Sequence, residues 1–192
     1  MELFIIIFCS YLIGSIPFGF LLTKFFLKKD IRDIGSGNIG ATNALRTGNK
    51  AIGYSTLSLD ILKAVLPVIF IKFNYPDYIY LSSLCVFIGH VFPLWLKFKG
   101  GKGIATYVGI LFCLDLMFGL IFIFTWLIIY LIFKYSSLSS LIASLSIPAY
   151  LLLFLNGKNI FFFLIMFILI FFTHRKNIKR LINKEESKTK IY

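Results

Sequence analysis

The residues best suited to chemistry lie between Gly35 and Arg46, which read Gly-Ser-Gly-Asn-Ile-Gly-Ala-Thr-Asn-Ala-Leu-Arg. Ser36 offers a hydroxyl, Asn38 and Asn43 offer amide donors, and the Arg46 guanidinium can grip a phosphate with two parallel hydrogen bonds. Three glycines allow positive φ angles and close approach of the backbone to a ligand: Gly35, Gly37 and Gly40. A solvated turn that caps a helix is the simpler alternative, but the density of polar groups favours a phosphate or oxyanion site.

A second polar stretch contains three glycines around a lysine: Gly100, Gly101, Lys102 and Gly103. We expect its backbone N–H groups to form a nest for phosphate, with the ammonium at the rim and a helix beginning near Gly103. It is not a Walker A loop, which needs glycine in place of Leu96 and Ser or Thr in place of Gly103. The alternative is a flexible loop whose lysines touch lipid headgroups. Nearby, a lone histidine at the end of an apolar run, His90, is more often structural than titrating.

The third polar stretch begins at His174, near the C-terminus. If the last helix continues through it, His174, Asn177 and Arg180 share roughly one face, since they are spaced i, i+3, i+6. A base or donor, an amide and a guanidinium would then point toward the same region. The alternative, a basic anchor for anionic lipid, explains the neighbouring lysines but not the histidine and the asparagine.

One charged pair lies inside an apolar run. Asp60 and Lys63 are spaced i, i+3, so they can form an ion pair that lowers the cost of burying either charge. We interpret them as structural support, and a role in substrate binding is the less favoured alternative.

The composition indicates that these stretches are positioned by membrane helices. The chain has 192 residues, of which 59% are hydrophobic and 15% charged, and we expect a single domain over residues 1–192. The net charge of +12 is explained by basic residues that collect where cytoplasmic loops meet anionic lipid, and no basic stripe with exposed aromatics indicates nucleic acid. The three cysteines lie in apolar runs, where small buried side chains are expected. The N-terminus is typical of a first span rather than a signal peptide.

The fold class is therefore an all-α integral membrane protein with about seven transmembrane helices. The apolar runs are 3–23, 52–71, 78–96, 104–118, 119–133, 138–155 and 159–173. Residues 103–133 are too long for one span, so we expect a turn near Asp115; the cluster 156–159 is expected to interrupt the following stretch. Five helices is the fallback if each long stretch is one bent element.

Charge predicts the orientation. Most lysines and arginines fall at 24–50, 97–102, 134 and in the tail from 175, whereas only Lys72 and Lys158 fall on the opposite side. The excess of positive charge in cytoplasmic loops therefore predicts an N-terminus outside and a cytoplasmic C-terminus. All three polar stretches are then expected at the cytoplasmic face.

These stretches together resemble the bacterial acyl-phosphate:glycerol-3-phosphate acyltransferases, the PlsY family of integral membrane enzymes. The motifs that carry the resemblance are Ser36-Gly37-Asn38-x-Gly40-Ala41-Thr42-Asn43-x-x-Arg46, then Gly89-His90 to Phe92-Pro93 with Phe98-x-Gly100-Gly101-Lys102-Gly103-x-Ala105-Thr106, and finally His174-x-x-Asn177-Ile178-x-Arg180-Leu181 with Glu186. The likeness extends to residues 14–19 and to Asp60 with Lys63. The third motif departs from the family pattern at Lys184, where glycine is usual, and at Thr173, where arginine is frequent.

The resemblance implies transfer of a fatty acyl group from acyl phosphate to the 1-hydroxyl of sn-glycerol 3-phosphate, giving lysophosphatidic acid and phosphate. This is the first step of bacterial phospholipid synthesis, carried out in the inner membrane with the site facing the cytoplasm. No metal or cofactor is needed, and a soluble enzyme that forms acyl phosphate is a candidate partner. We expect these site residues: for catalysis Ser36, Arg46, His174 and Asn177; for substrate binding Asn38, Gly100, Gly101, Lys102, Gly103 and Arg180; for structural support Asp60, Lys63 and Glu186.

Two other classes compete with this hypothesis. A transporter for a phosphorylated solute would place polar groups near the bilayer midplane, often with internal repeats, and neither feature is visible. A lipid-binding scaffold explains the basic tail but not Ser36, His174 or Asn177.

Overall fold

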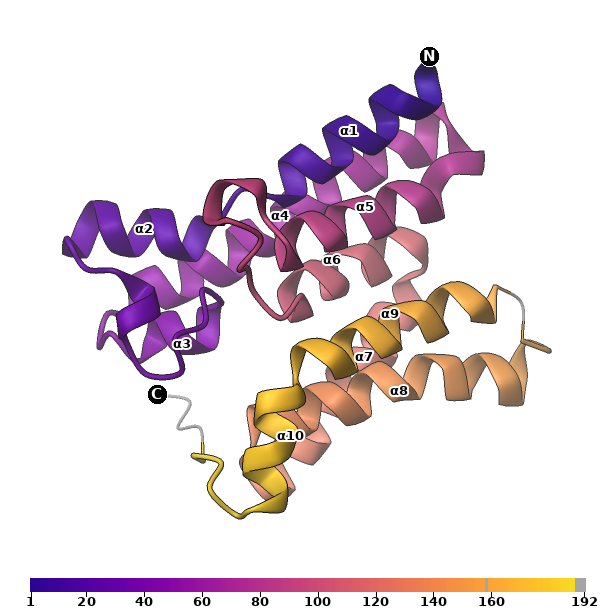
Figure 1. Cartoon of the computed structure of the whole chain (residues 1–192). Coiled ribbons are helices and arrows are strands. Elements are labelled where there is room, and N and C mark those ends of the chain that lie inside the picture. Colours follow the sequence, from indigo (N-terminus) through magenta and orange to yellow (C-terminus); the bar gives the residue numbers. More distant parts are fainter. Residues whose placement is uncertain (158, 189–192) are drawn as a thin grey trace. The chain divides into compact units, whose positions relative to one another are not determined.

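The computed structural model describes residues 1–157 and 159–188, which are helical with no strand among them. They form two compact units, Met1–Leu114 and Asp115–Tyr192 (Figure 1). Lys158, used above in the charge count, lies outside the described residues, as does Lys190 of the tail.

The first unit is built on three helices that pack side by side, α1, α4 and α5, with α6 against α4 (Figure 1). Its α-helices are α1 (Glu2–Gly14), α2 (Phe18–Leu27), α3 (Ala41–Leu45), α4 (Lys50–Asn74), α5 (Ile79–Val91) and α6 (Ile104–Leu114). Three short 3₁₀ helices connect them: η1 (Ile31–Asp33), η2 (Pro76–Tyr78) and η3 (Leu94–Leu96).

Glycines set the closeness of α1 and α5. A Cβ on Gly14 would overlap the backbone of Val86, and a Cβ on Gly89 would overlap the backbone of Tyr11. The two helices therefore approach backbone to backbone, and a buried hydrogen bond of 2.9 Å between the hydroxyls of Ser10 and Ser82 joins them. This packing positions the C-terminal end of α5, which contains His90.

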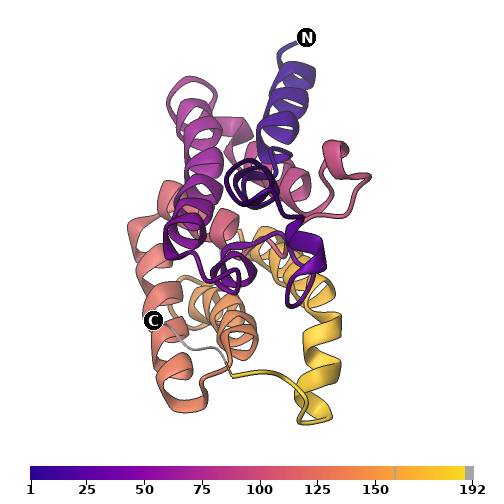
Figure 2. The same ribbon diagram turned by 90° about the vertical axis from the view of Figure 1, so that its left-hand side faces the viewer.

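In the second unit, α8 lies between α7 and α9, and α10 turns away from α9 (Figure 2). The helices are α7 (Leu116–Phe133), α8 (Ser136–Phe154), α9 (Ile160–Thr173) and α10 (Arg175–Ile182). Trp126 on α7 donates to the Ser140 hydroxyl on α8 at 3.1 Å, while Phe118 and Phe163 meet edge to face with centroids 5.2 Å apart. The axes of α9 and α10 differ by 63°.

The predicted interruptions of the two long apolar stretches are confirmed. Helix α6 ends at Leu114 and α7 begins at Leu116, with the Asp115 carboxylate capping α7 by accepting from the N–H of Met117 at 2.7 Å. Helices α8 and α9 are separate on either side of residues 155–159. The first apolar run, in contrast, is broken between α1 and α2 at Ser15-Ile16-Pro17, where proline favours the start of a helix over its interior.

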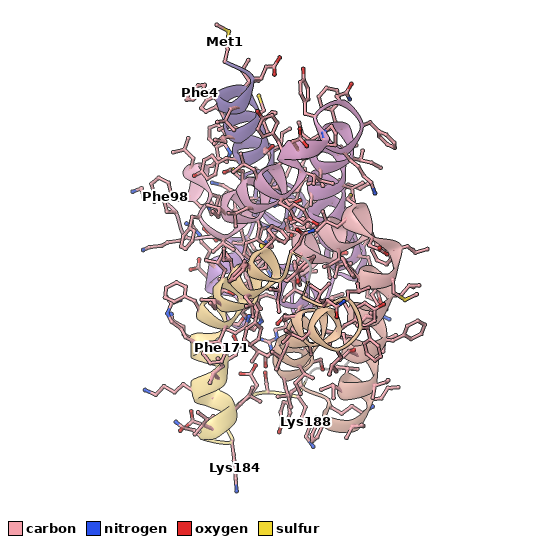
Figure 3. The ribbon with its side chains drawn as sticks, turned by 90° about the vertical axis from the view of Figure 1, so that its right-hand side faces the viewer. Met1, Phe4, Phe98, Phe171, Lys184 and Lys188 are labelled. Carbon is pink, nitrogen blue, oxygen red and sulfur yellow. The ribbon has the colours of Figure 1, made fainter. Side chains whose placement is uncertain are left out.

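Every apolar run predicted from the sequence contains a helix, but the number of spans is not confirmed as seven. Four helical segments of the described chain are long and apolar enough to cross a membrane: Glu2–Leu27, Pro76–Leu96, Leu116–Phe133 and Ser136–Phe154. The bent pair α9–α10 brings the number to five at most. Large apolar side chains on these helices are exposed, among them Phe4 and Phe171 at 70% and 51%, as expected for contact with lipid (Figure 3).

Candidate active site

The loop that carries Ser36 is closed by the buried side chain of Asn43. Its amide nitrogen lies 2.8–3.1 Å from the carbonyl oxygens of Ile31, Ile34 and Asn38, and its oxygen accepts from the N–H of Ser36 at 2.9 Å. The expectation that Asn43 donates to a ligand is therefore wrong, because its amide hydrogens are used to hold the loop. What Asn43 provides is a fixed backbone position for Ser36.

Two of the three predicted positive φ angles in this loop are confirmed. Gly35 and Gly37 have φ values of +54° and +70°, whereas Gly40 precedes α3 with φ −82°. A side chain on Gly35 would meet Arg46, whose Cδ would be 2.8 Å from the added Cβ. The Arg46 side chain therefore lies along the glycine turn, beside the exposed residue Ser36.

A small apolar cluster holds this loop to the rest of the first unit. Its buried members are Ile31, Ile39, Ala44, Ile52 and Leu96. Leu96 comes from η3, immediately before the stretch that contains Lys102, so the first two polar stretches are attached to one cluster. The sequence predicted both stretches but not this shared support.

The glycine stretch after η3 does not form the predicted nest with all of its N–H groups. The N–H of Gly100 donates to the carbonyl of Val91 at 3.0 Å and that of Gly101 donates to the carbonyl of His90 at 3.1 Å. These two donors thus return the chain to the end of α5. Gly103, with φ +85°, immediately precedes α6, so the predicted helix start is confirmed and Lys102 lies half-buried beside it. Phe98 points outward and is 56% exposed (Figure 3).

Asp60 and Lys63 form the ion pair expected from their spacing. Lys63 Nζ lies 2.7 Å from Asp60 Oδ1, and both side chains are at most 3% exposed. Lys63 also donates to the carbonyl of Ile16 at 2.7 Å, in the break between α1 and α2. His90, equally buried, brings Nδ1 to 3.6 Å from Asp60 Oδ1. The pair is thus part of a larger buried group that joins α4, α5 and the α1–α2 break.

In the second unit, His174 lies at the bend where α9 ends. Its Nδ1 lies 2.8 Å from the carbonyl of Ile170, and the residue is 2% exposed. Because a carbonyl can only accept, Nδ1 carries a proton, and in the neutral ring Nε2 is the acceptor. The last apolar helix does not continue through the third stretch, so the condition for a shared face is not met: α10 is a separate helix that starts after His174.

Glu186 gathers the remaining polar groups of the tail. Its carboxylate accepts from Asn177 and Arg180 at 2.6 Å each and from the hydroxyl of Ser137 at 2.7 Å. Burial raises the pKa of Glu186, but the bonds from Arg180, Asn177 and Ser137 outweigh it and hold that pKa below its ordinary value. The acid that contacts this motif is Glu186, whereas Glu185 is exposed.

Sequence reasoning missed two contributors to these sites. Ser137 and Glu186 are 49 residues apart in sequence, and no spacing pattern marks that contact. His90 was interpreted as structural, but its position against both Asp60 and the glycine stretch was not foreseen. Within the described residues no three His, Cys, Asp or Glu side chains are grouped so that they could hold a metal ion.

Solved structures define the class of protein. The chain is similar to the crystal structure of PlsY, an integral membrane glycerol 3-phosphate acyltransferase, in its glycerol 3-phosphate form, with a TM-score of 0.90 and 33% identity over 98% of this chain and 96% of that chain. The lysophosphatidic acid form of PlsY gives a TM-score of 0.87 over 98% and 95% of the two chains. The helices of this chain therefore have the fold of an integral membrane acyltransferase.

Sequence comparison identifies the family. The family model for glycerol-3-phosphate acyltransferase matches residues 4–184. The glycerol-3-phosphate acyltransferase of Pelagibacter ubique is 70% identical over the full length of both chains, and that of Mesorhizobium japonicum is 48% identical over 93% of this chain and 92% of its own. The chain belongs to the glycerol-3-phosphate acyltransferase family.

Proposed function

We propose that this chain transfers a fatty acyl group from acyl phosphate to the 1-hydroxyl of sn-glycerol 3-phosphate. Membership of the family carries the acyltransferase activity and the acceptor. The hydroxyl oxygen attacks the acyl carbonyl carbon, the bond from that carbon to the phosphate oxygen breaks, and lysophosphatidic acid and inorganic phosphate form. The proton of the hydroxyl passes to a base or to the leaving phosphate.

The donor is inferred from the motifs. Acyl-CoA users of the common kind carry His-x-x-x-x-Asp, but in this chain the fifth residue after His90 is Trp95 and the fifth after His174 is Lys179. Acyl phosphate is an activated mixed anhydride, so positioning and electrostatic stabilisation can supply most of the lowering of the barrier. Both substrates then carry phosphate, which accounts for a guanidinium or ammonium group in each polar stretch.

In the first unit we assign the donor to the Ser36 loop and the acceptor to the Lys102 loop. Ser36, Asn38 and Arg46 orient the acyl phosphate and stabilise the charge that develops on the carbonyl oxygen. The fixed backbone of this loop supports that role, because a preorganised donor needs no rearrangement during the reaction. Lys102, with Gly100, Gly101 and Gly103, holds the glycerol phosphate at the start of α6.

In the second unit we propose that His174 and Asn177 position the 1-hydroxyl of glycerol 3-phosphate. The protonated Nδ1 of His174 leaves Nε2 in the form that accepts a proton, which supports its role as general base. Glu186 holds Asn177 and Arg180 from one side, which supports a structural role for Glu186 and a phosphate-binding role for Arg180.

We further propose the bacterial inner membrane as the location, seven spans with the N-terminus outside, and catalysis on the cytoplasmic face by the whole of residues 1–192. Membrane lipid and a soluble enzyme that forms acyl phosphate are the proposed partners. The positive charge of the segments around all three polar stretches supports this orientation.

The test of the reaction uses purified protein in lipid nanodiscs with acyl phosphate and glycerol 3-phosphate. We expect phosphate release and formation of lysophosphatidic acid in equal amounts. Activity with acyl-CoA but none with acyl phosphate would overturn the donor assignment. Flux of a phosphorylated solute into sealed vesicles, with no acyl transfer, would favour the transporter hypothesis.

The residue assignments are tested in the same assay. Ser36→Ala and His174→Ala are expected to abolish turnover while the protein remains inserted, with a loss of about 100-fold or more for a general base. Lys102→Ala is expected chiefly to raise the KM for glycerol 3-phosphate, and an unchanged KM would remove Lys102 from the binding site.

A further inference from the structure

The buried group around Asp60 contains more than an ion pair. Asp60, Lys63 and His90 are each at most 3% exposed, and they come from α4 and the last turn of α5. A buried ion pair is weak evidence for stability, because well-packed apolar residues often serve the fold as well or better. Stability of the fold therefore does not by itself account for charges buried here. The contacts of His90 indicate that they position the backbone at Gly101.

The imidazole of His90 lies between the ion pair and the glycine stretch. Its Nδ1 faces Asp60 Oδ1 at 3.6 Å, which is longer than a usual hydrogen bond. On its other side the ring meets Gly101: a Cβ added there would overlap Nε2 and would lie 2.7 Å from Cε1. The ring is thus a spacer in direct contact with the backbone that leads to Lys102.

The neighbouring glycine has a different environment. A Cβ on Gly100 would overlap the carbonyl oxygen of His90 and the ring of Pro93, not the imidazole. The backbone bonds of this turn, from Gly100 to Val91 and from Gly101 to His90, are also independent of the imidazole. Of these two glycines, Gly101 is the one that meets the imidazole, and removing the ring is expected to leave the two backbone hydrogen bonds of the turn in place.

We propose that His90 is a positioning residue for the acceptor: held by the Asp60–Lys63 pair, its imidazole fixes the backbone at Gly101 and so places Lys102 for the phosphate of glycerol 3-phosphate. This inference rests on the proposed role of Lys102. His90 itself touches no substrate in this mechanism. In this way Asp60 and Lys63 on α4 influence the Lys102 loop through the imidazole of His90.

The experiment is a pair of double-mutant cycles. His90→Ala and Gly101→Ala are each expected to raise the KM and the Kd for glycerol 3-phosphate about tenfold, which corresponds to about 1.4 kcal/mol, with kcat and the KM for acyl phosphate within about twofold of wild type. In His90→Ala/Gly101→Ala the added methyl occupies the space of the lost ring. The double variant is therefore expected to bind no more weakly than either single variant.

The matched control is the same cycle with Gly100→Ala. Its methyl meets backbone oxygens and the ring of Pro93 rather than the imidazole, so His90→Ala cannot relieve it, and the two effects on Kd are expected to multiply. Multiplication in both cycles, or a fall in kcat with no change in KM and Kd, would overturn the positioning role. Because Kd is measured by calorimetry without any acyl donor, failure of acyl phosphate to react would reject the proposed donor and leave this test intact.

Discussion

At the scale of single residues, Asn43 was expected from the sequence to donate to a ligand, but its side chain holds the backbone of the Ser36 loop. The side chain of Asn43 binds the carbonyls of three residues and the N–H of Ser36, whereas the side-chain oxygen of Asn38 accepts from the N–H of Gly40 at 2.9 Å. Both are asparagines in the same polar stretch, Asn38 in the loop and Asn43 in α3, and nothing in their type or spacing tells them apart. Their difference depends on the fold of the loop over its apolar cluster.

Asn43→Ala is expected to lower the free energy of unfolding by at least about 2 kcal/mol, because buried carbonyls and an N–H lose their partner and each costs about 1–3 kcal/mol. Activity should fall as well, since Ser36 loses its fixed position. Unfolding of the protein by SDS in mixed micelles measures the change. Asn38→Ala is the matched control and should cost no more than about 1 kcal/mol; equal losses for both variants would contradict the assignment.

The lowered pKa of Glu186 predicts that the folded protein loses stability in acid. Its pKa in the folded protein is held below the ordinary value of 4.5, so its contribution is fully present above pH 4.5 and is lost as the pH falls through the lowered pKa. Thermal unfolding in detergent between pH 6 and pH 3 measures this dependence (roughly the range over which such a carboxylate titrates). Glu186→Gln should flatten the curve.

Asp30 provides the control for that measurement. The adjacent Arg32 guanidinium lowers the pKa of Asp30 to about 2, but the pair is exposed, so solvent screens its effect on stability. Asp30→Asn should therefore leave the curve almost unchanged. A curve that responds to Asp30→Asn and not to Glu186→Gln would contradict the role of Glu186 in holding the tail.

At the scale of helices, the sequence predicted the two breaks inside the long apolar stretches but neither the break at Ser15-Ile16-Pro17 nor the bend at His174. Asp115 and the cluster at 156–159 stand out in apolar stretches, and the chain turns at both. The bend at His174 has neither glycine nor proline beside it, so the spacing of the tail was interpreted as one continuous helix. The bend places Asn177 and Arg180 on a separate helix, α10, where both donate to Glu186, and a helical wheel cannot show this.

The same scale explains what Asp60 and Lys63 do for the helices. Their spacing predicted the pair, but the third partner is the carbonyl of Ile16, where the backbone between α1 and α2 has left the helix. The ammonium thus joins α4 to a break far away in sequence. Such a contact has no sequence signature, because its acceptor is a backbone atom.

Asp60→Leu is expected to cost about 3–5 kcal/mol of folding free energy, since it leaves the Lys63 charge buried without its counter-ion. The double variant Asp60→Leu/Lys63→Met should recover most of this loss. SDS unfolding measures both. A double variant as unstable as the single one would show that the link from Lys63 to Ile16, rather than the charge balance, is what the fold needs.

At the scale of the whole molecule, the predicted topology depends on which helices cross the membrane and on which side the positively charged loops lie. The predicted seven-span topology and its five-span fallback differ in where residue 134 lies. Seven spans return the chain to the cytoplasm after α7, whereas the fallback crosses the membrane only once over residues 103–133 and leaves residue 134 outside. The seven helical segments match the predicted runs, but α6 has only 11 residues, about 16 Å of helix, which is short for a hydrocarbon core of about 30 Å. Helix composition alone therefore does not decide between the two topologies.

Cysteine accessibility decides it. In a Cys9→Ser background, Asp77→Cys is expected to react with a membrane-impermeant maleimide on intact cells, and Lys99→Cys only after the membrane is opened, because the positive charge of residues 97–102 belongs on the cytoplasmic side. All of the substituted positions are exposed, so failure to react reports the side of the membrane rather than burial. With seven spans, Lys134→Cys is protected on intact cells and Asn156→Cys is labelled. Labelling of Lys134→Cys from outside would establish five spans, and labelling of Lys99→Cys from outside would reverse the orientation and remove the Lys102 loop from the cytoplasmic face.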